Sequence, residues 1–163
     1  MTGNGLMVRN RQRSRRINTR DLRRIILHLL EVELAFEHFD IAVHLVGEDV
    51  MTQANSVYLN HEGCTDVITF DHILPGQNPG LQGDLMVCVP EAVRQAKQFR
   101  ATWQKEIMRY IVHGTLHLCG YDDHKASDRR TMKGMENRIL GRLARKFDLN
   151  RLSAPRKTTS RSR

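Results

Sequence analysis

The sequence predicts an α+β fold, a small mixed sheet of about three or four strands packed with about five helices, with a zinc site at a helix end. Three observations predict it. Apolar residues recur at helical spacing in several segments, and short β-branched runs lie between them. Two histidines four residues apart precede a glycine that can end a helix. A length of 163 residues is enough for one domain with a buried core.

The first half of the chain is predicted to hold two helices and two strands. Asn18 and Thr19 are both good N-caps, so the first helix is expected to start at one of them, and leucine and isoleucine recur at helical spacing from there to about residue 36. Residues 41–46, IAVHLV, are typical of a buried strand, and residues 48–60 of a helix. Four side chains of this helix are expected to face inward: Val50, Ala54, Val57 and Tyr58. The run TDVITF, 65–70, is short and β-branched and predicts a second strand.

The second half is predicted to hold one strand and three helices. After a loop that contains proline and glycine, GDLMVCV at 83–89 predicts the third strand. Pro90 opens a helix that runs to about residue 99, because proline suits the first helical turn. The next helix covers 102–118 and stops before Gly120, and the last covers 127–147. One stripe of this last helix is apolar: Met132, Met135, Ile139, Leu143 and Phe147.

The positive charge lies at the two ends of the chain, whose formal net charge is +8. Residues 1–24 contain eight arginines and one acidic residue, and residues 151–163 contain four arginines, one lysine and no acidic residue. We expect a basic flexible arm at 1–17 and a basic flexible tail at 151–163, because both have few apolar residues with which to pack. We expect them to flank a single domain at 18–150. Clustered arginine favours contact with nucleic-acid phosphates, and a solubilising tail is the alternative.

Cysteine usage and hydropathy indicate the compartment. The three cysteines form no CxxC pair, which argues against a disulfide framework and favours a reducing cytoplasm. No segment approaches the about 20 apolar residues of a membrane helix, and the N-terminus lacks the apolar run of a signal peptide. We therefore expect a cytoplasmic protein without a membrane partner.

A metal site is predicted in the stretch HGTLHLCGYDDH. His113 and His117 are four residues apart on a helix, so their imidazoles share one face and can converge on one tetrahedral cation. Gly120 then lets the chain double back, and the following loop can supply a third ligand, Asp123 or His124. Three ligands and one open position are the layout of a catalytic zinc site. The alternative is a helix end whose histidines complement the helix dipole.

The same stretch resembles the HGxLHLxGYDH signature of the YbeY family, the zinc-dependent endoribonucleases and rRNA maturation factors of bacteria. TDVITF resembles the family's TDVLSF strand, GDLMVCVPEAVRQA resembles its strand and following helix, and MENRIL is similar to its closing helix. The resemblance covers about residues 41–145. It implies one zinc ion held by three side chains, cleavage of single-stranded RNA, maturation of the 16S rRNA 3′ end and ribosome quality control, with the small ribosomal subunit as a partner.

The chain departs from the family pattern at two places that concern the site. The family's third histidine stands six residues after the second, where this chain has Asp123, and His124 follows one residue later. Alignment with the family favours Asp123, and the usual preference of zinc favours His124. The family's arginine after a tyrosine is Leu59 here, so Arg109 or an arm would have to supply that cation.

Four residues are candidates for the general base. Peptidases with an HExxH motif carry a glutamate where this chain has Gly114, so a base must come from elsewhere. Glu106 lies seven residues before His113 on the same helical face, where it could orient a ligand or form an ordinary salt bridge. The other candidates are Asp66, Asp84 and His61, and the two aspartates at strand starts could instead form turns.

The predicted function is a zinc-dependent endoribonuclease in which His113, His117, Glu106 and Asp66 take part in catalysis. Two alternatives remain open. One is a non-catalytic ribosome assembly factor with a structural zinc, and the other is a metalloprotease-like peptidase. The three-ligand count argues against the first alternative and Gly114 against the second.

Overall fold

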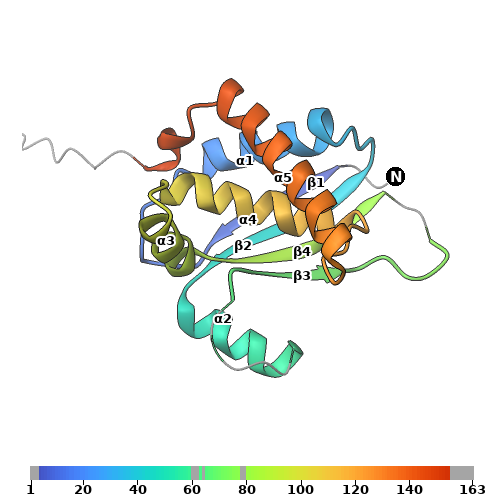
Figure 1. Ribbon diagram of the computed structural model, residues 1–163, viewed down its shortest axis with the longest axis horizontal. Helices are drawn as coiled ribbons and strands as arrows, with labels where there is room; N and C mark the ends of the chain where they lie inside the picture. The colour runs from blue at the N-terminus through green and yellow to red at the C-terminus, as the bar shows by residue number, and fades with distance from the viewer. Residues whose placement is uncertain (1–3, 60–62, 64, 78–79, 155–163) are drawn as a thin grey trace, which may run out of the picture.

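The computed structural model describes residues 4–59, 63, 65–77 and 80–154 (Figure 1). Within these residues five α-helices pack with a four-stranded sheet, which confirms the predicted α+β class. The strands are β1 (Gly5–Asn10), β2 (Phe39–Val46), β3 (Val67–Asp71) and β4 (Leu81–Cys88). The α-helices are α1 (Thr19–His28), α2 (Glu48–Ala54), α3 (Val89–Gln98), α4 (Trp103–Leu118) and α5 (Ala126–Lys146). Two π-helices extend α1 and α2, η1 (Leu29–Glu33) and η2 (Asn55–Leu59), and a 3₁₀ helix, η3, covers Leu149–Leu152.

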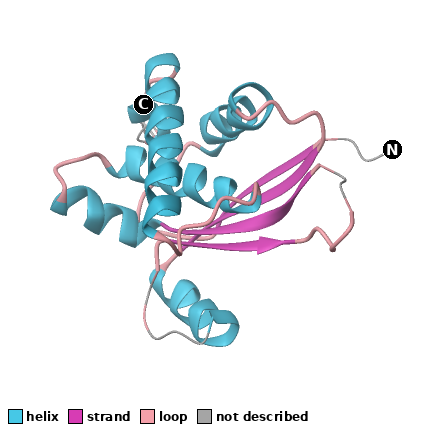
Figure 2. Cartoon of the chain, turned by 45° about the vertical axis from the view of Figure 1, so that its right-hand side comes forward, coloured by secondary structure: helices cyan, strands magenta, loops and turns pink. Residues whose placement is uncertain are grey.

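The sheet is mixed, with strand order β1-β2-β4-β3. Strands β1, β2 and β4 are parallel, and β3 pairs antiparallel with β4. Helices α1, α4 and α5 lie on one side of the sheet and α2 on the other, as Figure 2 shows. The larger apolar core therefore lies between the sheet and helices α1, α4 and α5. A smaller cluster around Met51, Ile68 and Cys88 lies beneath α2.

The prediction of a flexible arm at 1–17 is wrong for residues 5–17. Residues 5–10 form β1, an edge strand whose register on β2 runs from Gly5 opposite Asp40 to Asn10 opposite Leu45. Leu6 is buried and Val8 packs against the core, so an apolar side chain at every second residue was enough to order this strand. Ile17 is buried as well. Most arginines of this ordered segment are exposed and Arg15 is half-buried, and the domain begins before residue 18.

The predicted tail is also ordered in the part that the structure describes. Leu152 is buried in the core, and the backbone N–H of Asn18 donates to its carbonyl at 2.8 Å. Ile17 and Ser153 form an isolated antiparallel bridge. The two segments predicted to flank the domain as arms therefore pair with each other. Residues 155–163 of the predicted tail lie outside the described residues.

Most element boundaries agree with the sequence prediction to within about two residues, which is the usual uncertainty of helix ends. The predicted inward face of α2 is largely wrong. Ala54 is buried as expected, but Val50, Val57 and Tyr58 are exposed. The helix turns only a narrow face to the sheet, made by Met51, Ala54 and Asn55. The π-helical turn η2, which contains Val57 and Tyr58, departs from the 3.6-residue period of an α-helix.

Helix α4 lies at the centre of the fold. Thr102 caps its start by accepting from the backbone N–H of Lys105 at 3.3 Å. At Gly114 the helix approaches the sheet so closely that a Cβ atom would overlap Leu85 and press on Val67. Gly120 then adopts a φ of 99°, which glycine tolerates at a helix end. The part of the chain that the structure describes contains no helix with the length and apolar character needed to cross a membrane.

We predict opposite effects on stability for two glycine substitutions in helices. Gly114→Ala should lower the free energy of unfolding by about 1–3 kcal/mol, because the added methyl group overpacks the α4–sheet contact. Gly134→Ala on α5 meets open space and should raise it by up to about 1 kcal/mol through helix propensity. Urea unfolding of both variants measures the difference. Equal stabilisation by both would contradict the close packing at Gly114.

Candidate metal centre

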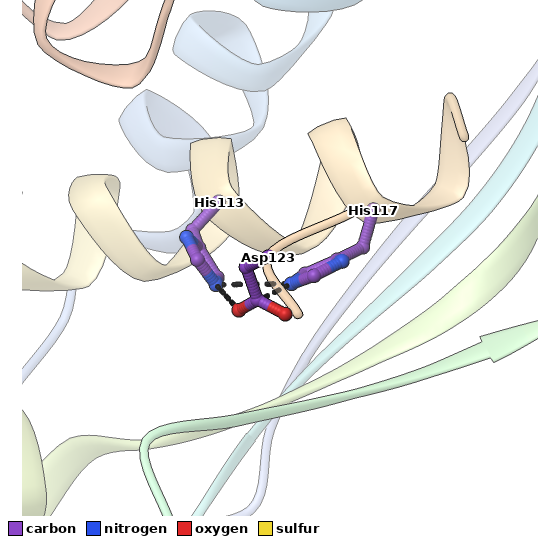
Figure 3. A group of neighbouring side chains, drawn as sticks. All are labelled: His113, His117 and Asp123. Atoms are coloured by element: carbon purple, nitrogen blue, oxygen red, sulfur yellow. Dashed lines mark hydrogen bonds and ion pairs between the residues drawn. The ribbon is translucent and has the colours of Figure 1, made fainter. Parts of the chain in front are cut away.

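The two histidines of α4 lie side by side on one half-buried strip of the helix. Their four-residue spacing places the rings 4.7 Å apart between centroids. The Nε2 atoms of His113 and His117 are 3.1 Å apart and point toward the same space (Figure 3). The helix face that carries both rings is half-buried, whereas the opposite face of α4 is packed into the core. The sequence prediction that the two imidazoles converge is therefore confirmed.

Asp123 reaches the same space from the loop that follows α4. The backbone N–H of Gly120 donates to His117 O at 3.0 Å and that of Tyr121 to Leu116 O at 3.1 Å, so the chain turns back sharply. The Oδ2 atom of Asp123 then lies 3.5 Å from His117 Nε2 and 3.9 Å from His113 Nε2. One ligand atom from each of these three residues fits within 4.8 Å of the others.

His124 faces elsewhere. Its Nε2 atom pairs with Asp122 Oδ1 at 3.4 Å, and its side chain is 86% exposed. It groups with Asp122 and Asp123 in a second, more exposed cluster, without His113 or His117. Of the two residues that the sequence left open, the structure brings Asp123 to the histidine pair.

The hydrogen bonds behind the rings determine which nitrogens are free. His113 Nδ1 lies 2.8 Å from Glu136 Oε2, and His117 Nδ1 lies 3.1 Å from the carbonyl oxygen of Tyr121. A carboxylate and a carbonyl only accept, so each Nδ1 carries the proton and donates it. In the neutral rings both Nε2 lone pairs then face one another across 3.1 Å. A shared proton or a metal cation between the two nitrogens relieves this repulsion, and the donor set of two imidazole nitrogens and one carboxylate fits a zinc ion.

Glu136 is the residue of this centre that sequence reasoning missed. It is buried, and its second oxygen, Oε1, accepts from Arg109 at 3.0 Å. The hydrogen bond with Glu136 raises the pKa of His113 above its ordinary value, although burial acts in the opposite direction. Burial raises the pKa of Glu136, but the hydrogen bonds from His113 and Arg109 hold it below its ordinary value. The segment MENRIL, already matched to the family's closing helix, contained the signal for this residue.

Glu106 contacts Arg109 and not the histidines. The distance from its Oε1 atom to Arg109 Nε is 3.5 Å. This is the salt bridge that the sequence left open as an alternative. Because Arg109 also binds Glu136, Glu106 is connected to His113 through two intervening side chains. Arg109 lies between two carboxylates, so most of its charge is compensated within the protein.

Asp66 and Asp84 occupy different environments. Asp66 caps the start of β3, where its Oδ1 atom accepts from the backbone N–H of Val67 at 2.8 Å. Asp84 pairs instead with His44 at 3.5 Å and His72 at 3.3 Å, and it lines a separate cavity. The candidate His61 lies outside the described residues.

A cavity of about 640 Å³ opens beside the metal centre. His113 and Asp123 line it together with Asp66 and Glu106, so it gathers most of the predicted site residues. The cationic residues in its lining are Arg109, Arg129 and Lys133. Arg129 also donates to the carbonyl oxygens of Asp123 at 3.3 Å and His124 at 3.0 Å, which holds the loop that carries Asp123.

Gly114 cannot be replaced by the glutamate of an HExxH peptidase in this packing. The position faces the sheet, where even a Cβ atom would overlap Leu85. A general base at this point of the helix has no access to the cavity. The structure therefore strengthens the sequence argument against a peptidase.

Comparison with known proteins identifies the family. The family model described as "Endoribonuclease YbeY" matches residues 7–144. The Endoribonuclease YbeY of Finegoldia magna is 32% identical over 141 residues, which are 83% of this chain and 91% of the relative. That of Macrococcus caseolyticus is 30% identical over 135 residues, covering 79% of this chain and 88% of the relative.

A solved structure agrees with the fold. The solution structure of a Thermotoga maritima protein superimposes with a TM-score of 0.64 at 21% sequence identity, covering 94% of this chain and 99% of the other. At this identity the likeness concerns the fold alone. The match to the family model and the identity with the curated relatives decide the assignment: this chain belongs to the endoribonuclease YbeY family.

Proposed function

We propose that this protein is a zinc-dependent endoribonuclease that cleaves single-stranded RNA, with one zinc ion held by His113, His117 and Asp123. One observation carries the proposal. The two Nε2 atoms lie 3.1 Å apart while both Nδ1 atoms face hydrogen-bond acceptors. The endoribonuclease names of the relatives supply the substrate class.

The ion would supply chemistry that the side chains lack: bound zinc lowers the pKa of water to about 7 and polarises a phosphoryl oxygen. The protein's own residues hold the ligands in place. Glu136 fixes the ring of His113, and the carbonyl of Tyr121 fixes that of His117. Three protein ligands leave the fourth tetrahedral position open, as catalytic zinc sites require.

We assign Arg129 and Lys133 to the RNA. Both line the cavity beside His113, and Lys133 has no side-chain partner within the described residues. The guanidinium group of Arg129 and the ammonium group of Lys133 can bind the phosphates that flank the cleaved bond. They can also supply the positive charge that the family's arginine would provide at the position of Leu59. Arg109 is poorly suited to this role because Glu106 and Glu136 compensate its charge.

Asp66 is our candidate for the general base. It lines the same cavity, and its Oδ2 atom has no partner within the described part of the chain. That oxygen would accept the proton of the attacking nucleophile, which is either a water molecule or the neighbouring 2′-hydroxyl group of the RNA. Glu106 takes a positioning role, because it holds Arg109, which in turn holds Glu136.

Resemblance to the family also suggests the biological setting. We propose maturation of the 16S rRNA 3′ end and ribosome quality control, with the small ribosomal subunit as partner in the cytoplasm. The second candidate, an assembly factor with a structural zinc, is less well supported because structural sites usually have four protein ligands. In the described residues the histidine pair is joined by one carboxylate only.

Two adjacent substitutions test the ligand set and the activity together. Asp123→Ala should lose zinc and RNA cleavage, because it removes the only carboxylate grouped with both histidines among the described residues. His124→Ala should keep both, since its side chain is solvent-exposed and faces Asp122. Metal analysis and cleavage of a single-stranded RNA are measured on the same samples. Zinc retained by Asp123→Ala and lost by His124→Ala would reverse the ligand assignment. RNA cleavage at the wild-type rate by zinc-free protein would refute the zinc-dependent mechanism.

The role of Glu136 is tested by Glu136→Gln. Zinc affinity should fall about 10–100-fold, as expected when the carboxylate that orients a ligating histidine is lost. The matched control is Glu33→Gln, which removes the carboxylate of another glutamate–histidine pair, with His28 at 3.4 Å, away from the cavity. Its zinc affinity should be unchanged.

The pH dependence of zinc binding gives a second measurement on the same variant. In the wild type, protonation of His113 competes with zinc. Glu136 raises the pKa of His113 and therefore the pH at which this competition begins. Zinc affinity should therefore fall as the pH decreases. In Glu136→Gln the fall should begin at a lower pH. An unchanged pH profile would show that Glu136 does not act through His113.

A further inference from the structure

Five arginines gather where the two ends of the described chain meet. Arg20, Arg23, Arg24 and Arg151 line one cavity of about 540 Å³, and Arg16 lies beside them on the segment that pairs with Ser153. We call these five residues the terminal basic surface. All five are exposed, and Asp21 is the one acidic residue among the described residues that line the cavity.

Backbone pairing holds this surface together. Ile17 and Ser153 form a bridge, and the backbone N–H of Asn18 donates to Leu152 O at 2.8 Å. The backbone N–H of Ala154 donates to Arg16 O at 3.2 Å. These bonds bring Arg151, from the far end of the chain, next to the arginines of α1.

A buried glutamine makes the loop before α1 rigid. The side chain of Gln12 donates to Arg15 O at 2.7 Å and to Asn10 Oδ1 at 2.9 Å, and its own oxygen accepts from the backbone N–H of Arg15 at 3.0 Å. Arg16 is therefore presented on a fixed backbone. Little backbone entropy therefore remains to be lost in this loop when a ligand binds, although the arginine side chains still have to be ordered.

Three of the five guanidinium groups are available to a ligand. Arg23 donates to the carbonyl of Leu6, and Arg24 lies 3.9 Å from Asp21. Within the described residues the side chains of Arg16, Arg20 and Arg151 have no hydrogen-bond or ion-pair partner. Clustered arginines without internal partners repel one another, and this repulsion is relieved when a polyanion binds.

The terminal basic surface lies away from the metal centre. Ser153 accepts from Gln104 at the first turn of α4 with a distance of 2.8 Å, whereas His113 and His117 lie in the second half of that helix. At a rise of about 1.5 Å per residue, 9 to 13 residues separate the two places by roughly 14–20 Å along α4. Figure 1 shows η3 at the left, near the start of α4, and the loop that follows α4 at the right.

We propose that the terminal basic surface is a second RNA-binding surface that anchors the phosphate backbone of the substrate away from the cleavage site. The inference rests on the proposed function for the choice of RNA as ligand. The described residues that line the cavity include no aromatic side chain on which a base could stack. Contact is therefore with phosphates and is independent of base sequence.

The test is the salt dependence of RNA binding by the full-length triple variant Arg16→Gln, Arg20→Gln, Arg151→Gln. Binding of single-stranded oligo(U) and oligo(A) is measured in chelator at several salt concentrations, so that the RNA stays intact. Loss of three phosphate contacts should reduce the slope of log K against log salt by about 2, equally for both RNAs. Circular dichroism and thermal unfolding verify that the variant is folded.

The matched control is Lys97→Gln, Lys105→Gln, Arg138→Gln, which removes three exposed cations from three other helices and should leave the slope unchanged. An unchanged slope in the first variant, or equal flattening in both, would overturn the proposal. So would an unchanged RNA slope with lost binding to vesicles of anionic lipid, which would identify a membrane-contact surface. If the wild type binds RNA with the predicted salt dependence but does not cleave it, the endoribonuclease proposal is refuted and the RNA-binding role of the terminal basic surface is still supported.

Discussion

The close contact between α4 and the sheet is the constraint on which the rest of the structure depends. Gly114 has no side chain, so the helix lies directly on Leu85 and its neighbours. That contact fixes the rotation of α4 about its axis and leaves the strip that carries His113 and His117 at the edge of the core. The same orientation places His113 against Glu136 of α5. A helix packed further from the sheet would lose the ring orientation on which metal binding depends.

Much of this centre could be predicted from the sequence because its parts are local. Histidines four residues apart share a helix face, and a glycine can end the helix so that the chain turns back. The choice between Asp123 and His124 could not be predicted, since one residue in a loop changes which side chain turns inward. Glu136 was missed because its contact with His113 crosses 23 residues of sequence, and no local periodicity reports it.

The error at the N-terminus has a different cause. Arginine-rich composition suggested a flexible arm, but edge strands need few apolar residues, and Leu6 with Val8 and a ladder of backbone hydrogen bonds to β2 was sufficient. The positions of Val57 and Tyr58 were misjudged because both lie in the π-helical turn η2, which breaks the 3.6-residue period, whereas Val50 lies before this turn on the exposed side of α2. Charge thus has two roles here: Arg109 is compensated inside the fold and positions Glu136, whereas the arginines near both termini are displayed on its surface.

The central claim is that His113, His117 and Asp123 form one zinc site with its orientation set from behind by Glu136. The most direct test is a crystal structure of the zinc-loaded protein with anomalous data at the zinc edge. The account predicts one strong peak at about 2.0–2.2 Å from both Nε2 atoms and from a carboxylate oxygen of Asp123, with the Glu136 contact retained. A peak between Asp122 and His124 with none between the two histidines would contradict it.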